Sequence, residues 1–253
     1  MSEWQALSGR ITLFPSGPPT SPLPSAEDMF RKVWGIAPQM FQQQQNPLTP
    51  GIAQGTRGQM NLNCLVHPSR VDVTLTPPIA DTGELKVAFI EDTNELFAEF
   101  ARIIDSVNTG PVPTPISRVG LSMQIATTVQ GSEEGNNVVT QAMPEEYRVK
   151  LTNEEDFIFH VNRQRKSEVI QNVTMNFISK WSVDNVQVFR MFPGTITFPA
   201  APQMQTFKVA SLTLDYNNVP AERQLNLEEQ SQLLRECLTE AEKTLKSHRA
   251  RAN

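Results

Sequence analysis

Cysteine and histidine are scarce in this chain, and each scarcity excludes a class of protein. Of its 253 residues, two are cysteines and three are histidines. Cys64 and Cys237 fall on the apolar sides of an expected strand and an expected helix, where a free thiol behaves as a small hydrophobic group, so we expect no disulfide framework. His67, His160 and His248 lack the paired spacing of a zinc site, and we expect neither a metal site nor a cofactor.

Long apolar runs and a positive net charge are also missing. No segment approaches the roughly 20 apolar residues of a membrane-crossing helix, and the first ten residues lack the basic and apolar regions of a secretion signal. We therefore expect a cytoplasmic protein with no membrane partner. The net charge of -5 argues against a general polyanion binder, because neutralising phosphates takes a basic surface.

Signatures of catalysis are absent as well. The glycine-containing stretch 51–58 lacks the lysine and hydroxyl of a phosphate-binding loop, and no serine lies in a Gly-x-Ser-x-Gly elbow. Acidic groups at 133–134, 145–146 and 154–156 fall on expected loops, where neighbouring carboxylates are usually solvated. We therefore expect a protein that is not an enzyme.

The most informative feature present is a repeated order of elements. Each half begins with an isolated strand, continues with a strand-turn-strand pair, and closes with a strand that leads into an amphipathic helix. These segments are 9–14, 60–76 and 85–107 in the first half, and 117–125, 172–192 and 207–245 in the second. The proline-rich stretch 109–115 predicts a connector between a first half, 1–108, and a second half, 116–253. The predicted fold class is α+β, with two pseudo-repeated β-α-β-β-β-α halves whose antiparallel sheets carry helices on one face.

Local patterns place several of these elements. Ser25 predicts the start of a short helix that ends near Gly35, and the cap pairs Asp92 with Glu95 and Asn226 with Glu229 precede long apolar stripes. Alternation predicts further strands at 147–151 and 156–163. Basic residues crowd the end of the last helix, which is typical of a solvated terminus.

One polar cluster, residues 160–167, stands out in this acidic chain. It gathers hydrogen-bonding groups and three positive charges at an expected strand end and its turn, where arginine can bind phosphate or a carboxylate. An ordinary basic hairpin turn is the alternative. Trp181, in the expected second hairpin, can stack on a base or a partner side chain, or serve as a core anchor. The candidate binding residues are His160, Asn162, Arg163, Arg165, Lys166 and Trp181.

Three short motifs, at 118–121, 160–163 and 214–217, resemble a sporadically distributed, mostly uncharacterised bacterial family of about this length. Their order and spacing cover nearly the whole chain. Some members of that family lie near phage-defence or toxin-antitoxin genes, so the resemblance implies a partner-dependent role. It supplies no catalytic residues.

These observations predict a non-enzymatic cytoplasmic protein-interaction module. The resemblance implies an antitoxin-like or phage-defence accessory role, with a toxin or defence effector as the protein partner. The alternative is a nucleic-acid or nucleotide-binding module that uses the basic turn 160–167, and the third is an enzyme that acts on a phosphate-containing substrate through His160. The sequence also leaves open whether copies of the chain associate with one another. A basic groove along a sheet would favour nucleic acid, whereas an acidic surface with apolar patches would favour a protein partner.

Overall fold

A computed structural model describes residues 3–16, 23–43, 49–78, 85–107, 115–149, 157–190, 203–221 and 223–252. These residues form nine strands, four α-helices and one short 3-10 helix. The strands are β1 (Gln5–Pro15), β2 (Met40–Gln42), β3 (Gly51–Arg57), β4 (Met60–His67), β5 (Arg70–Thr76), β6 (Ile116–Val129), β7 (Ile158–Lys166), β8 (Thr174–Arg190) and β9 (Gln203–Asn218). The helices are α1 (Ala26–Trp34), α2 (Thr93–Val107), α3 (Ser132–Ala142), η1 (Glu145–Tyr147) and α4 (Leu227–Ala252).

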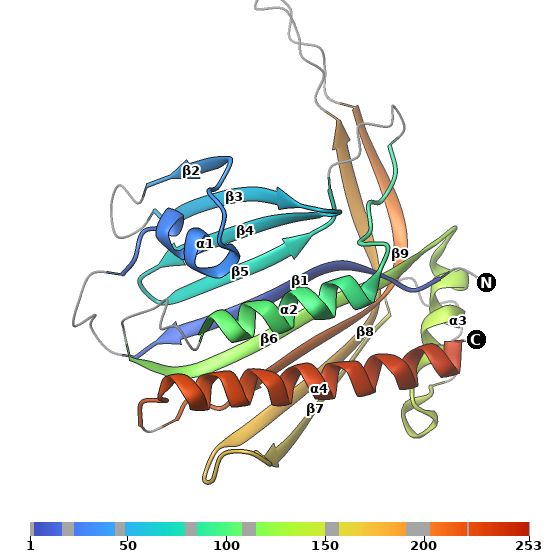
Figure 1. The fold of residues 1–253 in the computed structure, drawn as a ribbon. Coiled ribbons are helices and arrows are strands. Elements are labelled where there is room, and N and C mark those ends of the chain that lie inside the picture. The colour runs from blue at the N-terminus through green and yellow to red at the C-terminus, as the bar shows by residue number, and fades with distance from the viewer. Residues whose placement is uncertain are drawn as a thin grey trace, which may run out of the picture.

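All nine strands belong to one antiparallel sheet, in the order β2-β3-β4-β5-β1-β6-β9-β8-β7 (Figure 1). The α+β class is therefore confirmed. The separate sheets expected for the two halves are a single sheet, because β1 and β6 pair directly along nearly the whole of β1. Hydrogen bonds between the two central strands thus join the first half of the chain to the second.

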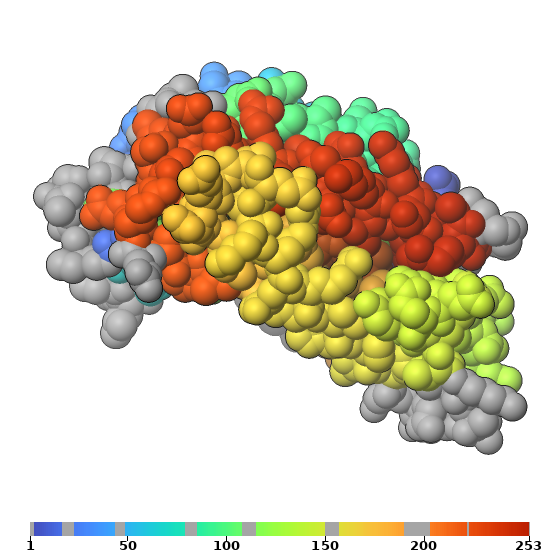
Figure 2. Space-filling view, turned by 90° about the horizontal axis from the view of Figure 1, so that it is seen from below, coloured from blue at the N-terminus to red at the C-terminus, as the bar shows by residue number. Residues whose placement is uncertain are grey.

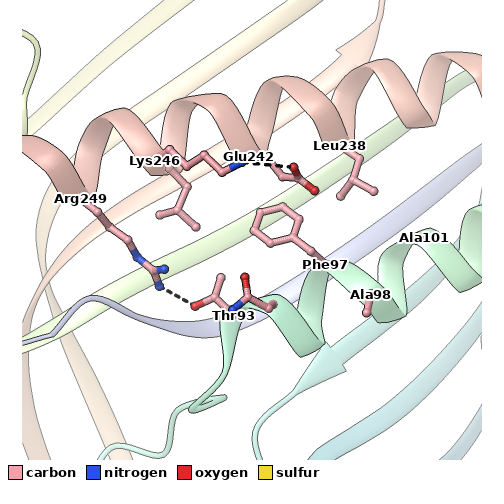
Figure 3. Close-up of a pocket in the computed structure, with 10 residues that line it drawn as sticks. Thr93, Phe97, Ala98, Ala101, Leu238, Glu242, Lys246 and Arg249 are labelled. Carbon is pink, nitrogen blue, oxygen red and sulfur yellow. Dashed lines mark hydrogen bonds and ion pairs between the residues drawn. The ribbon is translucent and has the colours of Figure 1, made fainter.

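Helices α1, α2 and α4 cover one face of this sheet, and α2 and α4 lie side by side on it (Figures 1 and 3). The predicted stripe of α2 is buried against the strands, with Phe100 fully buried. The helix approaches β1 closely at Gly9, where a Cβ atom would lie 2.3 Å from Cζ of Phe100. Glycine at this position therefore sets how near α2 packs to the sheet.

The predicted helix starts at Ser25 and Asn226 and the predicted end at Gly35 are confirmed, whereas α4 continues to Ala252, beyond the predicted end at 245. The Ser25 hydroxyl accepts a hydrogen bond from the backbone N–H of Asp28 at 3.0 Å, and Gly35 ends α1 in the left-handed conformation with a φ of 69°. Before α4, the Asn226 side chain accepts from the N–H of Glu229, and Glu229 accepts from the N–H of Asn226, both at 2.9 Å. This reciprocal pair is a capping box, which a local sequence pattern can predict.

The cysteines are buried and free, as expected. Burial raises the pKa of the Cys64 thiol to about 12, and it also raises the pKa of Cys237. Both thiols therefore remain protonated and unreactive. No helix among the described residues combines the length and the apolar character needed to span a membrane.

Several predictions for the second half are wrong. The expected hairpin across 172–192 is one long strand over its described residues, β8. The expected strand 147–151 is not formed at 147–149, because Tyr147 ends the 3-10 helix; the rest of that segment lies outside the described residues. The acidic pairs at 133–134 and 145–146 lie in α3 and η1 rather than in loops, and 154–156 is not described.

Pattern reading also missed structure in the first half. Strands β2 and β3 had not been predicted, and the strand expected just before α2 is reduced to an isolated bridge between Ile90 and Ala6. Residues 85–89 instead contribute to a small second core, in which Val87 packs with Ala126 and Val209. Most of the connector 109–115 lies outside the described residues.

A candidate interaction surface on the open face of the sheet

The polar cluster 160–167 lies mainly in the edge strand β7 and not in a turn. Residues 160–166 pair with β8, from His160 opposite Lys180 to Lys166 opposite Thr174. Successive side chains of a strand point to opposite faces. The cluster is therefore divided between two surfaces: His160, Asn162 and Lys166 share one face of the sheet, and Arg163 and Arg165 share the other.

Arg165 is neutralised within the protein. Its guanidinium lies 3.6 Å from Oε1 of Glu236 and 3.4 Å from Oε2 of Glu240, and it also pairs with Glu168. Its Cζ stacks 4.5 Å from the ring centroid of Phe177. The Glu236 side chain is only 5% exposed, so Arg165 compensates a buried carboxylate on α4 and is not free to bind a ligand.

The segment after β7 continues this contact. The Ser167 hydroxyl donates to Oε2 of Glu236 at 2.6 Å, and the backbone N–H of Glu168 donates to Oε1 at 3.3 Å. Figure 2 shows this part of the chain, in yellow, against the red α4 helix. Arg165 and Ser167 thus fasten the edge of the sheet to α4. Arg163, by contrast, is exposed and has no carboxylate partner in the described chain.

Trp181 does not provide a stacking platform. Its side chain is 2% exposed, on the helix side of the sheet, and its ring centroid lies 6.2 Å from that of Phe159. The core-anchor alternative is the one that the structure bears out.

The face opposite α1, α2 and α4, here called the open face, carries the remaining cluster residues. Its membership follows from strand register, because the alternate positions of each strand point into the helix-covered core. The described charged side chains of the open face are Arg10, Arg70, Arg118, Lys166 and Lys180, with Asp72, Asp184 and Asp215. Positive charge is therefore in excess here, although the whole chain has a net charge of -5.

The carboxylates of the open face are already bonded. Asp72 accepts a hydrogen bond from Thr12 at 2.7 Å and pairs with Arg70 at 2.9 Å. Oδ2 of Asp184 accepts from the hydroxyls of Ser182 and Ser211 at 2.8 and 2.5 Å.

Several cations of the open face have no such partner. Within the described chain, Arg10, Lys166 and Lys180 have no carboxylate at ion-pair distance. The ammonium group of Lys166 donates only to the Thr174 hydroxyl, at 3.2 Å.

The Asp184 carboxylate next to two hydroxyls has no histidine beside it in the described chain, so this group lacks the base of a hydrolase triad.

A row of side-chain amides crosses the open face beside these cations. Gln164 donates to Oδ1 of Asn176 at 2.7 Å, and Asn176 donates to Oδ1 of Asn217 at 3.0 Å. Asn162 donates more weakly to the same Asn176 oxygen, at 3.4 Å. Amides both donate and accept hydrogen bonds, so the row can form hydrogen bonds with the backbone or the side chains of a bound partner. The sequence analysis named Asn162 as a candidate binding residue but missed Asn176 and Asn217 as members of such a row, although strict alternation along β8 and β9 could have revealed them.

Separate hollows lie on the helix side. One of them lies between α2 and α4 and has a volume of about 380 Å³. Figure 3 shows Phe97 and Leu238 on its walls. At one end, Arg249 donates to the hydroxyl of Thr93 at 2.6 Å. This contact joins the two helices, and the apolar walls can take a small apolar group.

The described residues contain no group of three or more histidine, cysteine, aspartate or glutamate side chains that could hold a metal ion. Comparison of the chain with protein-family models, with curated proteins and with solved structures gives no match.

Proposed function

We propose that the chain is a non-enzymatic protein-interaction module that binds an acidic partner through the β7–β8 end of its open face. The observation that carries this proposal is the set of cations there without carboxylate partners, in a protein that is acidic as a whole. An acidic partner would meet Lys166, Lys180 and His160 together. Complementary charge of this kind raises association rates and excludes partners of like charge.

The amide row supports the same proposal. It lies beside Lys166 and supplies donors and acceptors in a fixed arrangement, because Asn176 holds its neighbours on both sides. A partner side chain or backbone segment can exchange hydrogen bonds with this row while its carboxylates face the lysines. Arg165 and Trp181 support the surface from the helix side and do not touch the partner.

The class of partner comes from the resemblance and not from the geometry. A toxin or a defence effector in the cytoplasm is the partner that the resembled family implies, with an antitoxin-like or accessory role for this chain. This part of the proposal stands independently of which surface is used.

An internal duplication is also proposed, and the strand order supports it. Counting outwards from the central pair, β1, β5, β4 and β3 occupy one side and β6, β9, β8 and β7 occupy the other, with the short strand β2 added at the edge of the first side. The helices α2 and α4 follow the last strand of each half. Superposition of the two halves in an experimentally determined structure should place α2 on α4; unrelated positions would contradict the duplication.

Binding of a nucleic acid is the second candidate, and it uses the same cations. It is less well supported, because Trp181 is buried and the whole-chain charge repels phosphates. Salt dependence separates the two: each neutralised phosphate releases counterions, so a nucleic-acid complex must weaken steeply as salt rises.

The test compares matched charge reversals. The tagged protein is recovered from its native host as wild type, as Lys166→Glu/Lys180→Glu, and as the control Lys243→Glu/Lys246→Glu on exposed sites of α4. We expect a protein that resists nuclease treatment to be lost from the open-face variant and kept by the control. Equal retention by both variants would refute the open face as the binding surface, and loss on nuclease treatment would select the nucleic-acid candidate.

A further inference from the structure

Strand β7 forms one border of the sheet, and only one of its two edges is paired (Figure 1). All nine of its residues face residues of β8, and no described strand lies on its other side. The strand at the opposite border, β2, has only three residues and no charged side chain. A long unpaired edge is a template on which an extended chain can add a further strand.

Two hydrogen bonds identify the residues that present their backbone at this free edge. The N–H of Val183 donates to the carbonyl of Phe157 at 3.1 Å, and the N–H of Ser167 donates to the carbonyl of Val173 at 2.8 Å. Both bonds join odd-numbered residues that flank β7 to the β8 side, and the bonding direction alternates along an antiparallel strand. The N–H and C=O groups of the even-numbered residues in 158–166 therefore point away from β8, and none has a bonding partner in the described chain.

Exposed polar side chains flank the free edge on both faces of the sheet. Lys166 and His160 lie on the open face, and Arg163 lies between them on the helix side. Neither Lys166 nor Arg163 has a carboxylate at ion-pair distance in the described chain. Consecutive side chains of a strand alternate between faces, so a strand added here contacts both sets of residues. A ligand that lies flat on the open face contacts only one of them.

The charge of this edge selects its occupant. Two β7 strands paired with each other would place the cations of both copies along one seam, and like charges opposed across strands are destabilising. Charged side chains on edge strands commonly prevent self-pairing in this way. An extended segment with aspartate or glutamate instead pairs with the cations while its backbone completes the ladder.

We propose that an acidic extended segment of the partner adds to β7 as a further strand of the sheet. Its carboxylates lie opposite Lys166, Arg163 and His160, at a spacing of three residues, so consecutive carboxylates alternate between the two faces. This inference rests on the proposed function, because it specifies how an acidic partner binds at the β7–β8 end of the open face. It adds Arg163 and the backbone of β7 to the contact.

Backbone methylation of a peptide tests the added strand. The probe is a fluorescent peptide as long as β7, nine residues, with glutamate at every third position and threonine elsewhere. Its binding to the full chain is measured by fluorescence polarisation. N-methyl groups on alternate residues remove the hydrogen-bond donors from one edge of the added strand and leave the other edge intact.

We expect one of the two alternate methylation patterns to abolish binding and the other to retain it. A peptide with the same glutamates at alternate positions, which puts them all on one face, should bind more weakly than the parent. A parent peptide that does not bind would overturn the proposal. Binding that ignores the methylation pattern or the glutamate spacing would also overturn it, because the ligand would then be held by charge alone.

Arg163→Glu separates an added strand from a ligand on the open face alone. We expect this variant to bind the parent peptide about tenfold more weakly, because it removes one exposed ion pair and adds a like-charge contact of similar size. Lys32→Glu is the matched control, since Lys32 is an exposed cation on α1, and it should bind like the wild type. Unchanged binding by Arg163→Glu would refute the added strand.

The added strand and the proposed function can fail separately. Loss of the host protein from Lys166→Glu/Lys180→Glu, with peptide binding that ignores the methylation pattern, would refute the added strand and keep the proposed function. Retention of the host protein by that variant, with pattern-dependent peptide binding, would refute the proposed function and keep β7 as a site for an acidic strand.

Discussion

His248 should make the folded protein sensitive to acid. Its side chain is fully buried in α4, and its ring meets that of Trp4 edge-on, with the ring centroids 4.3 Å apart. Neither ring nitrogen has a partner that meets hydrogen-bond geometry in the described structure, although the carbonyl of Ala142 lies near the ring. Burial is the main cause that lowers the pKa of His248, to about 3; the charge of Arg251 acts in the same direction, and the carbonyl of Ala142 opposes it.

The sign and size of the effect follow from proton linkage. An unfolded histidine titrates near its ordinary pKa of about 6.5, whereas His248 in the folded protein stays neutral until the pH approaches 3. The unfolded state therefore binds more protons below pH 6.5, and the free energy of unfolding falls as the pH falls. The loss is about 2 kcal/mol at pH 5 and about 3 kcal/mol at pH 4.

Replacement by leucine isolates this contribution. His248→Leu removes the titrating group and two unpaired nitrogens from an apolar site, so at pH 7.5 the change in stability should stay within about 1.5 kcal/mol. At pH 5 the variant should gain about 2 kcal/mol relative to the wild type. Urea midpoints at both pH values and constant ionic strength measure the difference.

The exposed His160 provides the matched control. His160→Leu should leave the acid-dependent loss of the wild type in place, because His248 is still present. Parallel stability curves for the wild type and His248→Leu from pH 7.5 to 5 would refute the reasoning. Such a result would mean that His248 is protonated in the folded state or is not enclosed by Trp4 and α3.

Two further predictions concern packing and charge in the folded state. Arg165→Ala should cost about 3 kcal/mol because it leaves the carboxylate of Glu236 buried without its cation, and adding Glu236→Gln should recover part of that loss in a urea double-mutant cycle. An additive cycle would show that the two residues do not interact. Phe100→Ala should cost about 3 kcal/mol by opening a cavity, and Gly9→Ala should be less harmful in the Phe100→Ala background, since the ring that meets the new methyl group is gone. Equal costs of Gly9→Ala in both backgrounds, measured by urea unfolding, would contradict the close approach of α2 to β1.

The sequence alone was sufficient to predict those features whose contacts join residues close together in the chain. Caps such as Ser25 and Asn226 bond to residues three positions away, and the hairpin 60–76 alternates around a short turn. The helical stripes likewise repeat within a few turns. These patterns predicted the α+β class, α1, α2, α4 and the buried cysteines.

The tertiary structure alone decided how these elements share one sheet and which charges remain free. Arg165 belonged to a basic cluster in the sequence, but Glu236, which neutralises it, lies on α4 far along the chain. His248 was read as part of a solvated helix end, but Trp4 and α3 enclose it. The pairing of β1 with β6 creates the single sheet and its open face. Periodicity records which side of an element is apolar, whereas burial and charge neutralisation depend on distant residues that meet only when the chain folds.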